Sequence, residues 1–385
     1  MRGKGGAEIK HGLRAFVVAP EIAYISVLTE IYSSMPAPDS ASKIPVTVLT
    51  GYLGAGKTTL LNRILSEPHG KKFAVIVNEF GEIGIDNDLV VNADEEVFEM
   101  NNGCICCTVR GDLVRIIDGL MRRKGKFDAI IVETTGLADP APVAQTFFMD
   151  EAVGAKTKLD AVVTVADAKW LADRLKDAPE AKNQIAFADV ILLNKTDLVT
   201  AEELGELEAR IRGLNPYARL HRTQRAKIDI NEVLGRNAFD LDRILDIEPS
   251  FLDSDEHHHD HDHHHDHDDH HDHGHHHHGN GLKHYHDEEM QSVAIRLEGD
   301  VDPAKFMPWI NRVTQEQGPN ILRCKGIVAM KNDPKRFVFQ GVHMMLDGDS
   351  QREWKPDEKR ESKVVFIGHD LAEEDIRNGF LACAA

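Results

Sequence analysis

The segment at residues 51–58 has the residue types and spacing of a loop that binds phosphate. It reads Gly-Tyr-Leu-Gly-Ala-Gly-Lys-Thr and fits the pattern Gly-x-x-x-x-Gly-Lys-Thr. Glycines let backbone amides turn toward phosphate oxygens, and the start of a following helix adds the positive end of its dipole. In this pattern Lys57 reaches the β- and γ-phosphates, and the Thr58 hydroxyl binds Mg²⁺. The residues predicted to hold the nucleotide here are Gly51, Gly54, Ala55, Gly56, Lys57, Thr58 and Thr59.

A second group of polar residues follows the apolar run at residues 129–132. The chain there continues as Glu133-Thr134-Thr135-Gly136. An acidic residue at the carboxyl end of a strand can hold Mg²⁺ or one of its waters, and a glutamate favours the water-mediated contact. Gly136 is expected near the γ-phosphate. The alternative is a charged residue that only ends a strand. We predict Lys57, Thr58 and Glu133 as the catalytic residues, with Thr58 and Glu133 on the Mg²⁺ side.

The tetrapeptide Asn194-Lys195-Thr196-Asp197 follows another apolar run, at residues 190–193. A carboxylate at Asp197 would accept hydrogen bonds from guanine N1–H and the exocyclic amine. Adenine offers neither donor, and sites of this kind reject such analogues by up to ~10⁴-fold. The sequence therefore predicts GTP rather than ATP, with Asn194, Lys195 and Asp197 at the base.

Three of the five cysteines, Cys104, Cys106 and Cys107, lie within four positions. This is not the spacing of a disulfide framework, and it indicates a reducing compartment. Clustered thiolates repel one another unless a cation lies between them, and Zn²⁺ is the natural occupant. Three sulfurs leave a tetrahedral ion one ligand short, which suits an ion that is handed on. Buried, inert cysteines are the alternative.

An acidic loop with two glycines follows the apolar run at residues 73–77. It reads Asn-Glu-Phe-Gly-Glu-Ile-Gly-Ile-Asp and includes Glu79 and Glu82. Glycines make such a loop easy to move, so Glu79 and Glu82 could supply oxygen ligands that connect the nucleotide state to the cysteines. A solvated loop without ligands is the alternative reading.

The elements that must position these residues alternate along the chain. Short β-branched runs at residues 46–50, 73–77, 129–132, 161–165 and 190–193 read as buried strands, with longer amphipathic segments between them. This pattern predicts an α/β domain with a mostly parallel sheet over residues 44–237. The strand and helix on either side of residues 51–58 disfavour the alternative of a glycine-rich turn with an incidental lysine.

A second, smaller α+β domain is predicted over residues 290–385. Strands are expected at residues 292–297, 321–330, 336–345 and 363–367, and helices at residues 303–317 and from Leu371. Residues 1–43 are expected to form an extension ahead of the first domain, either disordered or lying before a translation start at Met35.

Residues 238–289 are predicted to be a disordered linker rich in His and Asp. Fifteen histidines lie between His257 and His278, and residues 253–289 carry twelve acidic residues against one lysine, out of a total formal charge of −19. Imidazoles suit Zn²⁺, Ni²⁺, Cu²⁺ and Co²⁺ alike, so the tract is expected to gather metal ions without choosing among them. A solvated linker is the alternative.

The composition limits the class of protein. No run approaches the ~20 apolar residues of a membrane-spanning helix, and no secretory leader with a cleavage site is apparent. We therefore expect a cytoplasmic protein that binds neither membrane nor nucleic acid.

Taken together and in order, these motifs resemble the CobW family of G3E GTPases, a SIMIBI-class group of P-loop GTPases that includes zinc chaperones. The segments that carry the resemblance are 51–60, 78–86, 102–107, 133–140 and 194–197, with Phe-Gln-Gly-Val-His at 339–343 and Val-Val-Phe-Ile-Gly at 364–368. The resemblance spans most of residues 44–385 and leaves out the extension before Ile44.

The resemblance implies a protein that hydrolyses GTP, binds Zn²⁺ at Cys104, Cys106 and Cys107, and delivers the ion to client apo-metalloproteins. It also implies Glu82 as a neighbouring ligand. Two other functions remain open from the sequence, a metal-buffering protein with a regulatory nucleotide site and a cobalt or nickel insertion factor of the cobalamin-synthesis type. The sequence leaves open the physiological metal, the client and a homo-oligomeric state.

Overall fold

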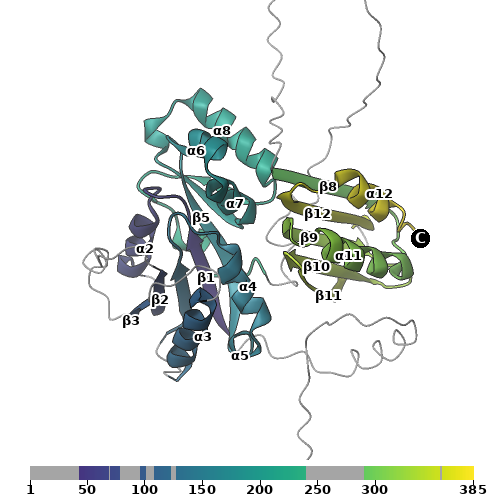
Figure 1. Ribbon diagram of the computed structural model, residues 1–385, viewed down its shortest axis with the longest axis horizontal. Coiled ribbons are helices and arrows are strands. Elements are labelled where there is room, and N and C mark those ends of the chain that lie inside the picture. Colours follow the sequence, from purple (N-terminus) through teal and green to yellow (C-terminus); the bar gives the residue numbers. More distant parts are fainter. Residues whose placement is uncertain are drawn as a thin grey trace, which may run out of the picture. The chain divides into compact units, whose positions relative to one another are not determined.

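The first domain is built on a sheet of seven parallel strands (Figure 1). A computed structural model describes residues 43–68, 70–78, 96–100, 108–122, 127–239, 290–355 and 358–385. The strands are β1 (Ile44–Thr50), β2 (Phe73–Asn78), β3 (Glu96–Met100), β4 (Ala129–Glu133), β5 (Thr157–Asp167), β6 (Val190–Asn194) and β7 (Arg219–Arg222). Their order is β3-β2-β4-β1-β5-β6-β7, with β1 at the centre. Because neighbouring strands are parallel, their carboxyl ends meet at one edge, where ligands of such sheets bind.

Alternation along the strands gives this sheet two apolar faces. Val46 and Val48 of β1 belong to one buried cluster, and Leu49 belongs to another. Burial on both faces explains why the strands read as continuous apolar runs. Helix α2 (Lys57–Ser66) packs in the cluster of Leu49. The helices of the other cluster are α3 (Thr108–Met121), α4 (Ala141–Met149), α5 (Glu151–Gly154), α6 (Leu171–Asp177), α7 (Pro179–Phe187) and α8 (Ala201–Leu214).

The predicted parallel α/β class is confirmed, and all five predicted strands of this domain are present. Two strands were not predicted. β3 reads Glu-Val-Phe-Glu-Met and β7 reads Arg-Leu-His-Arg, and they form the two edges of the sheet. Each pairs with a neighbour on one side only, so neither carries the long apolar run that marks a central strand.

The second domain is an antiparallel sheet with both of its helices on one face (Figure 1). Its elements are β8 (Met290–Glu298), α11 (Pro303–Gln317), β9 (Ile321–Ala329), β10 (Lys335–Val342), β11 (Met345–Glu353), β12 (Glu361–His369) and α12 (Glu373–Leu381), and the strand order is β11-β10-β9-β12-β8. The predicted α+β class is confirmed. The prediction of one strand over residues 336–345 is wrong, because a tight turn at His343, with φ 51°, separates β10 from β11.

Helix α11 shows how the sequence specifies this layer. Asp302 caps the helix by accepting a hydrogen bond of 2.9 Å from the Ala304 amide, and Pro303 occupies the first turn, where its missing N–H costs nothing. Phe306, Trp309, Ile310 and Val313 recur at helical spacing and are all buried against the sheet. Across the described part of the chain, no helix is both long enough and apolar enough to span a bilayer.

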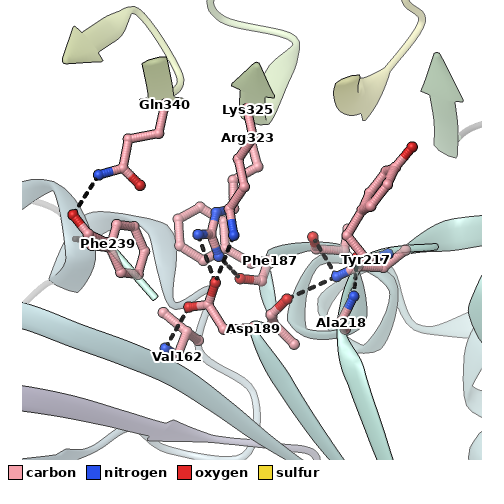
Figure 2. Close-up of polar contacts among 12 residues, drawn as sticks. Val162, Phe187, Asp189, Tyr217, Ala218, Phe239, Arg323, Lys325 and Gln340 are labelled. Carbon is pink, nitrogen blue, oxygen red and sulfur yellow. Dashed lines mark hydrogen bonds and ion pairs between the residues drawn. The ribbon is translucent and has the colours of Figure 1, made fainter. Parts of the chain in front are cut away.

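The two domains meet at a buried group of charges (Figure 2). Alternation along β9 directs Arg323 and Lys325 toward the first domain, where both reach Asp189, just ahead of β6. The Asp189 Oδ1 atom lies 2.7 Å from Arg323 Nη2 and 3.3 Å from Lys325 Nζ, and its Oδ2 atom accepts a hydrogen bond of 2.8 Å from the Val162 amide. Burial would raise the pKa of the Asp189 carboxyl, but the two cations outweigh burial and hold that pKa below its ordinary value.

Uncharged groups of the first domain also contact the second sheet at this place. The Arg323 guanidinium lies 4.3 Å from the centroid of the Phe239 ring and donates a hydrogen bond of 2.9 Å to the Phe187 carbonyl at the end of α7. Gln340 of β10 donates a hydrogen bond of 2.7 Å to the Phe239 carbonyl (Figure 2). One apolar cluster also continues from the helices of the first domain into the second sheet. The second sheet is therefore packed onto the first domain through both apolar and charged contacts.

Candidate nucleotide-binding site

The loop between β1 and α2 has a backbone that only glycine adopts easily. Gly51, Gly54 and Gly56 have φ values of 139°, 74° and 114°. A Cβ atom on Gly51 would lie 2.1 Å from the Val165 carbonyl oxygen, and one on Gly56 would lie 2.6 Å from the Asn194 side chain. Conformation and space thus both exclude a side chain at Gly51 and Gly56. This is the shape of a loop whose amides can surround a phosphate.

Lys57 lies across this loop at the first position of α2. Its side chain is buried, and its Nζ atom donates a hydrogen bond of 2.7 Å to the Gly51 carbonyl. The Ala55 amide closes the loop by donating to the Tyr52 carbonyl, at 3.2 Å. Thr58 is half-buried and Thr59 is exposed, both in the first turn of α2. The ammonium of Lys57 and the start of the helix are thus placed together, as the sequence requires for phosphate binding.

Glu133 ends β4 beside this loop. It is opposite Leu49 in the register of β1 and β4, and it is only 8 % exposed. The next residue, Thr134, donates a hydroxyl hydrogen bond of 2.9 Å to Thr50. A Cβ atom on Gly136 would lie 2.7 Å from Leu53 of the loop. The structure therefore brings Glu133 and Gly136 to the edge of the sheet that carries Lys57.

The buried Asn194 side chain connects three separate segments at this edge. Its Nδ2 atom donates a hydrogen bond of 2.9 Å to the Ala55 carbonyl, inside the glycine-rich loop. Its Oδ1 atom accepts hydrogen bonds from the Thr223 hydroxyl, at 3.1 Å, and from the Ala226 amide, at 2.8 Å. The phosphate loop, the end of β6 and the segment after β7 are thus fixed relative to one another.

Lys195 joins the same loop from the following position. Its Nζ atom donates a hydrogen bond of 2.8 Å to the Gly54 carbonyl and pairs with the Asp167 carboxylate at 2.6 Å. Its backbone is left-handed, with φ 61°, and directs the chain into the short 3₁₀ turn Thr196–Leu198. Asp197 lies in that turn and is exposed, as a carboxylate that reads a base must be before the base arrives.

Three residues of this arrangement were not predicted: Asp167, Thr223 and Ala226. Asp167 ends β5 and orients Lys195, while Thr223 and Ala226 fix Asn194. The only available signal is that Asp167 ends an apolar run, as Glu133 does. Thr223 and Ala226 follow a short edge strand that the sequence does not reveal.

These residues fit a magnesium-bound guanine nucleotide. The left-handed glycines give the loop the backbone of a phosphate loop, the Lys57 ammonium would supply the cation, and Asp197 would supply the acceptor that guanine can satisfy. The remaining predicted metal-side groups, Thr58 and Glu133, lie on elements that meet at the same edge. The predicted nucleotide residues end or follow β1, β4 and β6 at the carboxyl edge of the sheet, and their contacts with nucleotide stay a prediction.

A cavity of about 450 Å³ lies beside the glycine-rich loop, on its α6 and α7 side. Among its lining residues are Tyr52, Asp167, Trp170, Arg174 and Gln184, and neither Thr58 nor Asp197 belongs to it. The Arg174 guanidinium lies 5.3 Å from the centroid of the Tyr52 ring. Gly54 and Lys195, two of the predicted nucleotide residues, also line this cavity, which therefore adjoins the glycine-rich loop and the start of the Asn-Lys-Thr-Asp segment.

The predicted zinc ligands Cys104, Cys106, Cys107 and Glu82 lie outside the described residues, as does the histidine tract. Within the described ranges, no group of three or more His, Cys, Asp or Glu side chains is placed to hold a metal ion. The two described cysteines, Cys324 and Cys383, are free and buried, and burial raises the pKa of the Cys324 thiol to about 12. A thiol held protonated in this way is a poor metal ligand, which leaves the predicted cluster as the candidate.

A strand, a glycine-rich loop closed by lysine and threonine, a helix, and an Asn-Lys-Thr-Asp segment on one sheet edge define a P-loop nucleotide-binding protein. The chain belongs to the CobW family. Residues 45–222 match the family model described as CobW/HypB/UreG, nucleotide-binding domain, and residues 290–384 match the Cobalamin synthesis protein cobW C-terminal domain. The family inferred from the motifs is therefore confirmed.

Similar proteins agree with this assignment along nearly the whole chain. The zinc chaperone YjiA of Escherichia coli is 34% identical over 342 residues, which are 88% of this chain and 98% of that protein. Zinc-regulated GTPase metalloprotein activator 1 of Schizosaccharomyces pombe is 35% identical over 327 residues, 79% of this chain and 76% of that protein. The crystal structure of Zn(II)-bound YjiA GTPase from E. coli has a TM-score of 0.68 and 31% identity, covering 89% of this chain and 99% of that chain.

Proposed function

We propose that this chain hydrolyses GTP and uses the reaction to deliver Zn²⁺ to client metalloproteins. The observation that carries the proposal is the Asn194 side chain, which joins the glycine-rich loop to the Asn-Lys-Thr-Asp turn. A single nucleotide can thereby contact Lys57 with its phosphates and Asp197 with its base. The names of the zinc chaperone and of the metalloprotein activator among its relatives support the metal part of the proposal.

In this proposal each residue of the nucleotide site has its own role in GTP hydrolysis. Lys57, which lies across the glycine-rich loop, would stabilise the charge that develops on the transferring phosphate. Bound Mg²⁺, held by Thr58 and through water by Glu133, would neutralise further charge on the phosphate oxygens. Asn194 and Lys195 fix the loop, so the phosphate amides need no rearrangement during the reaction.

Slow hydrolysis by the isolated chain is part of the proposal. The residue after Gly136 is Leu137, which is 49% exposed and cannot orient an attacking water. The nearby Gln184 is buried and donates to the Gly136 and Ala138 carbonyls, so its amide is already engaged. A client or another partner would then accelerate the reaction.

We place the zinc site at Cys104, Cys106 and Cys107, with Glu82 as a neighbouring ligand, and regard the histidine tract as a store that supplies it. Free thiols of this kind need a reducing compartment, which supports a cytoplasmic location. The acidic segment that contains Glu82 follows β2 in the sequence, and β2 pairs with β4, the strand that ends at Glu133. Nucleotide exchange near Glu133 could therefore change the metal site.

The test is a binding and turnover measurement on purified chain with Mg²⁺. GTP should bind at least a hundredfold more tightly than ATP, since only guanine satisfies Asp197. Lys57→Ala should abolish phosphate release. Equal affinities for GTP and ATP, or unchanged turnover by Lys57→Ala, would contradict the proposal, and stoichiometric zinc binding without any turnover would favour a metal buffer instead.

A further inference from the structure

Helix α7 holds the loop that follows β4. Gln184 is 1% exposed, and its Nε2 atom donates hydrogen bonds to the Gly136 carbonyl, at 3.2 Å, and to the Ala138 carbonyl, at 3.0 Å. The main-chain carbonyl of Gln184 is itself fixed by the Thr164 hydroxyl of β5, at 2.8 Å. One buried amide therefore sets the position of the backbone from Gly136 to Ala138, because a shift of the loop would leave buried polar groups without partners.

The preceding residue, Asn183, connects the end of this loop to the second domain. Its Nδ2 atom donates a hydrogen bond of 3.1 Å to Asp139, and its Oδ1 atom lies 2.8 Å from His369 Nε2 at the end of β12. A carboxylate only accepts, so the Asn183 nitrogen faces Asp139 and its oxygen faces His369. The His369 ring therefore donates from Nε2. The other oxygen of Asp139 accepts from the Ala141 amide, at 2.9 Å, so both oxygens of this carboxylate are engaged.

The second domain also contacts the carboxyl end of the same helix. The Phe187 carbonyl accepts the hydrogen bond from Arg323 (Figure 2), and Phe187 follows Asn183 by four positions, which places both residues on one side of α7. Asp139 acts on a further residue of the second domain, because its charge favours the protonated form of His343, although burial holds the pKa of His343 below its ordinary value. Helix α7 thus lies between the loop after β4 and the second sheet.

We propose that Asn183 and Gln184 are positioning residues for GTP hydrolysis, and that docking of the second sheet through His369 sets the position of the loop from Gly136 to Asp139. The loop has little freedom, because a Cβ atom on Gly136 would already lie 2.7 Å from Leu53 of the phosphate loop. A partner that moves the second sheet would change the hydrolysis rate through Asn183. The proposal rests on the GTPase activity proposed above, and it names the route by which a client could control that activity.

The first test measures steady-state GTP hydrolysis by the full chain over a range of GTP concentrations with saturating Mg²⁺. Asn183→Ala and His369→Ala should each lower kcat roughly tenfold, within the usual range of coupling between sites, with KM for GTP nearly unchanged. The double variant should be no slower than Asn183→Ala, because that change already removes the contact of Asn183 with His369 as well as its contact with Asp139. His369→Gln should restore most of the rate, because its amide N–H can replace the imidazole donor.

Gln340→Ala is the matched control. It removes another hydrogen bond between the domains, to the Phe239 carbonyl, without touching α7, and should keep the wild-type kcat. A wild-type kcat in Asn183→Ala, an equal loss in Gln340→Ala, or additive losses in the double variant would overturn the proposal.

A second readout separates this proposal from the GTPase proposal. Amide hydrogen exchange in β12 should differ between chain bound to GDP and chain bound to a non-hydrolysable GTP analogue, and Asn183→Ala should abolish the difference. If the wild-type chain binds GTP without turnover but shows this difference in exchange, the GTPase proposal would be contradicted. The proposed coupling between the nucleotide site and the second sheet would still stand. Identical exchange in both nucleotide states would overturn the coupling, and a chain that binds no GTP would overturn both proposals.

Discussion

At the scale of single residues, the site depends on side chains that fix other side chains. Asp167 and Gly54 hold the Lys195 ammonium, while Asn194 holds Ala55, so the phosphate loop and the base turn are preorganised by direct hydrogen bonds. Asp197 differs from these residues because it is exposed and lies at the end of a short turn. We therefore propose that its carboxylate discriminates between bases.

Asp197→Asn should lower GTP affinity by roughly ten- to a hundredfold, the contribution of a hydrogen bond to a charged group. Xanthine nucleotides should gain affinity, because the new amide can donate to their C2 oxygen. Titration of the variant with GTP and with xanthosine triphosphate measures this change in base preference. Asp177→Asn, which changes an exposed carboxylate at the end of α6, is the control and should leave both affinities unchanged. Loss of GTP without any gain for xanthine nucleotides would argue against a base contact.

At the scale of elements, one buried carboxylate, Asp189, holds the charged part of the junction between the domains. Asp189 and Arg323 are almost completely buried, with side-chain exposures of 2% and 4%. Removing one partner of such a pair leaves a buried charge without compensation, whereas an exposed pair contributes little because water solvates both groups. The chain offers both cases, since Arg222 and Glu208 form a pair at the surface of the first domain, with side-chain exposures of 58% and 23%.

Asp189→Asn should therefore lower the free energy of unfolding by about 3 kcal/mol, and Glu208→Gln by less than about 1 kcal/mol. Because the folded-state pKa of Asp189 is depressed, its stabilisation is present above the unfolded value of about 4 and is lost as the pH falls through the folded pKa. Urea unfolding of the variants at neutral pH gives the comparison. An equal decrease in the free energy of unfolding for both variants would mean that burial does not make the Asp189–Arg323 pair contribute more to stability.

Strands that are buried on both faces of the sheet can be predicted from the sequence, because they are continuous apolar runs. Residues whose contacts are with residues far away in the sequence cannot be predicted in this way. The strands β1, β2, β4, β5 and β6 are apolar runs, so they could be predicted, and the phosphate loop carries its own signature. Edge strands β3 and β7 lack that run. Asn183 and Gln184 act on residues 44 and 48 positions away, and no local pattern marks such contacts. The turn at His343 also escaped prediction, because its left-handed backbone is taken by a histidine rather than a glycine.

At the scale of the whole molecule, two predicted metal sites of different chemistry belong to one chain. Clustered thiolates at Cys104, Cys106 and Cys107 should bind Zn²⁺ tightly, whereas a His and Asp segment must lose chain entropy to surround each ion and should bind it weakly. Only the cysteines follow a strand of the nucleotide sheet, since β3 ends at Met100. Their affinity alone should therefore depend on whether GTP or GDP is bound.

Deleting residues 253–286 should lower the number of ions bound and leave one tight site. Cys106→Ala should remove the tight site and leave the weak ones. Competition with a chelator, in each nucleotide state, distinguishes the two variants, and Cys324→Ala is the control because that thiol is buried in the second domain. Retention of a tight, nucleotide-sensitive site by Cys106→Ala would show that the cysteines are structural.

A chain that grows from its amino terminus makes the phosphate loop long before the residues that hold it. Ala55 depends on Asn194, and Asn194 depends on Thr223 and Ala226. The nucleotide site should therefore become competent late in synthesis, when residue 226 has left the ribosome. Stalled ribosomal complexes should retain a fluorescent GTP analogue when the chain ends within the histidine tract, and should fail to retain it when the chain ends at Leu214. Equal retention by both complexes would mean that the loop binds GTP before Thr223 and Ala226 can hold Asn194.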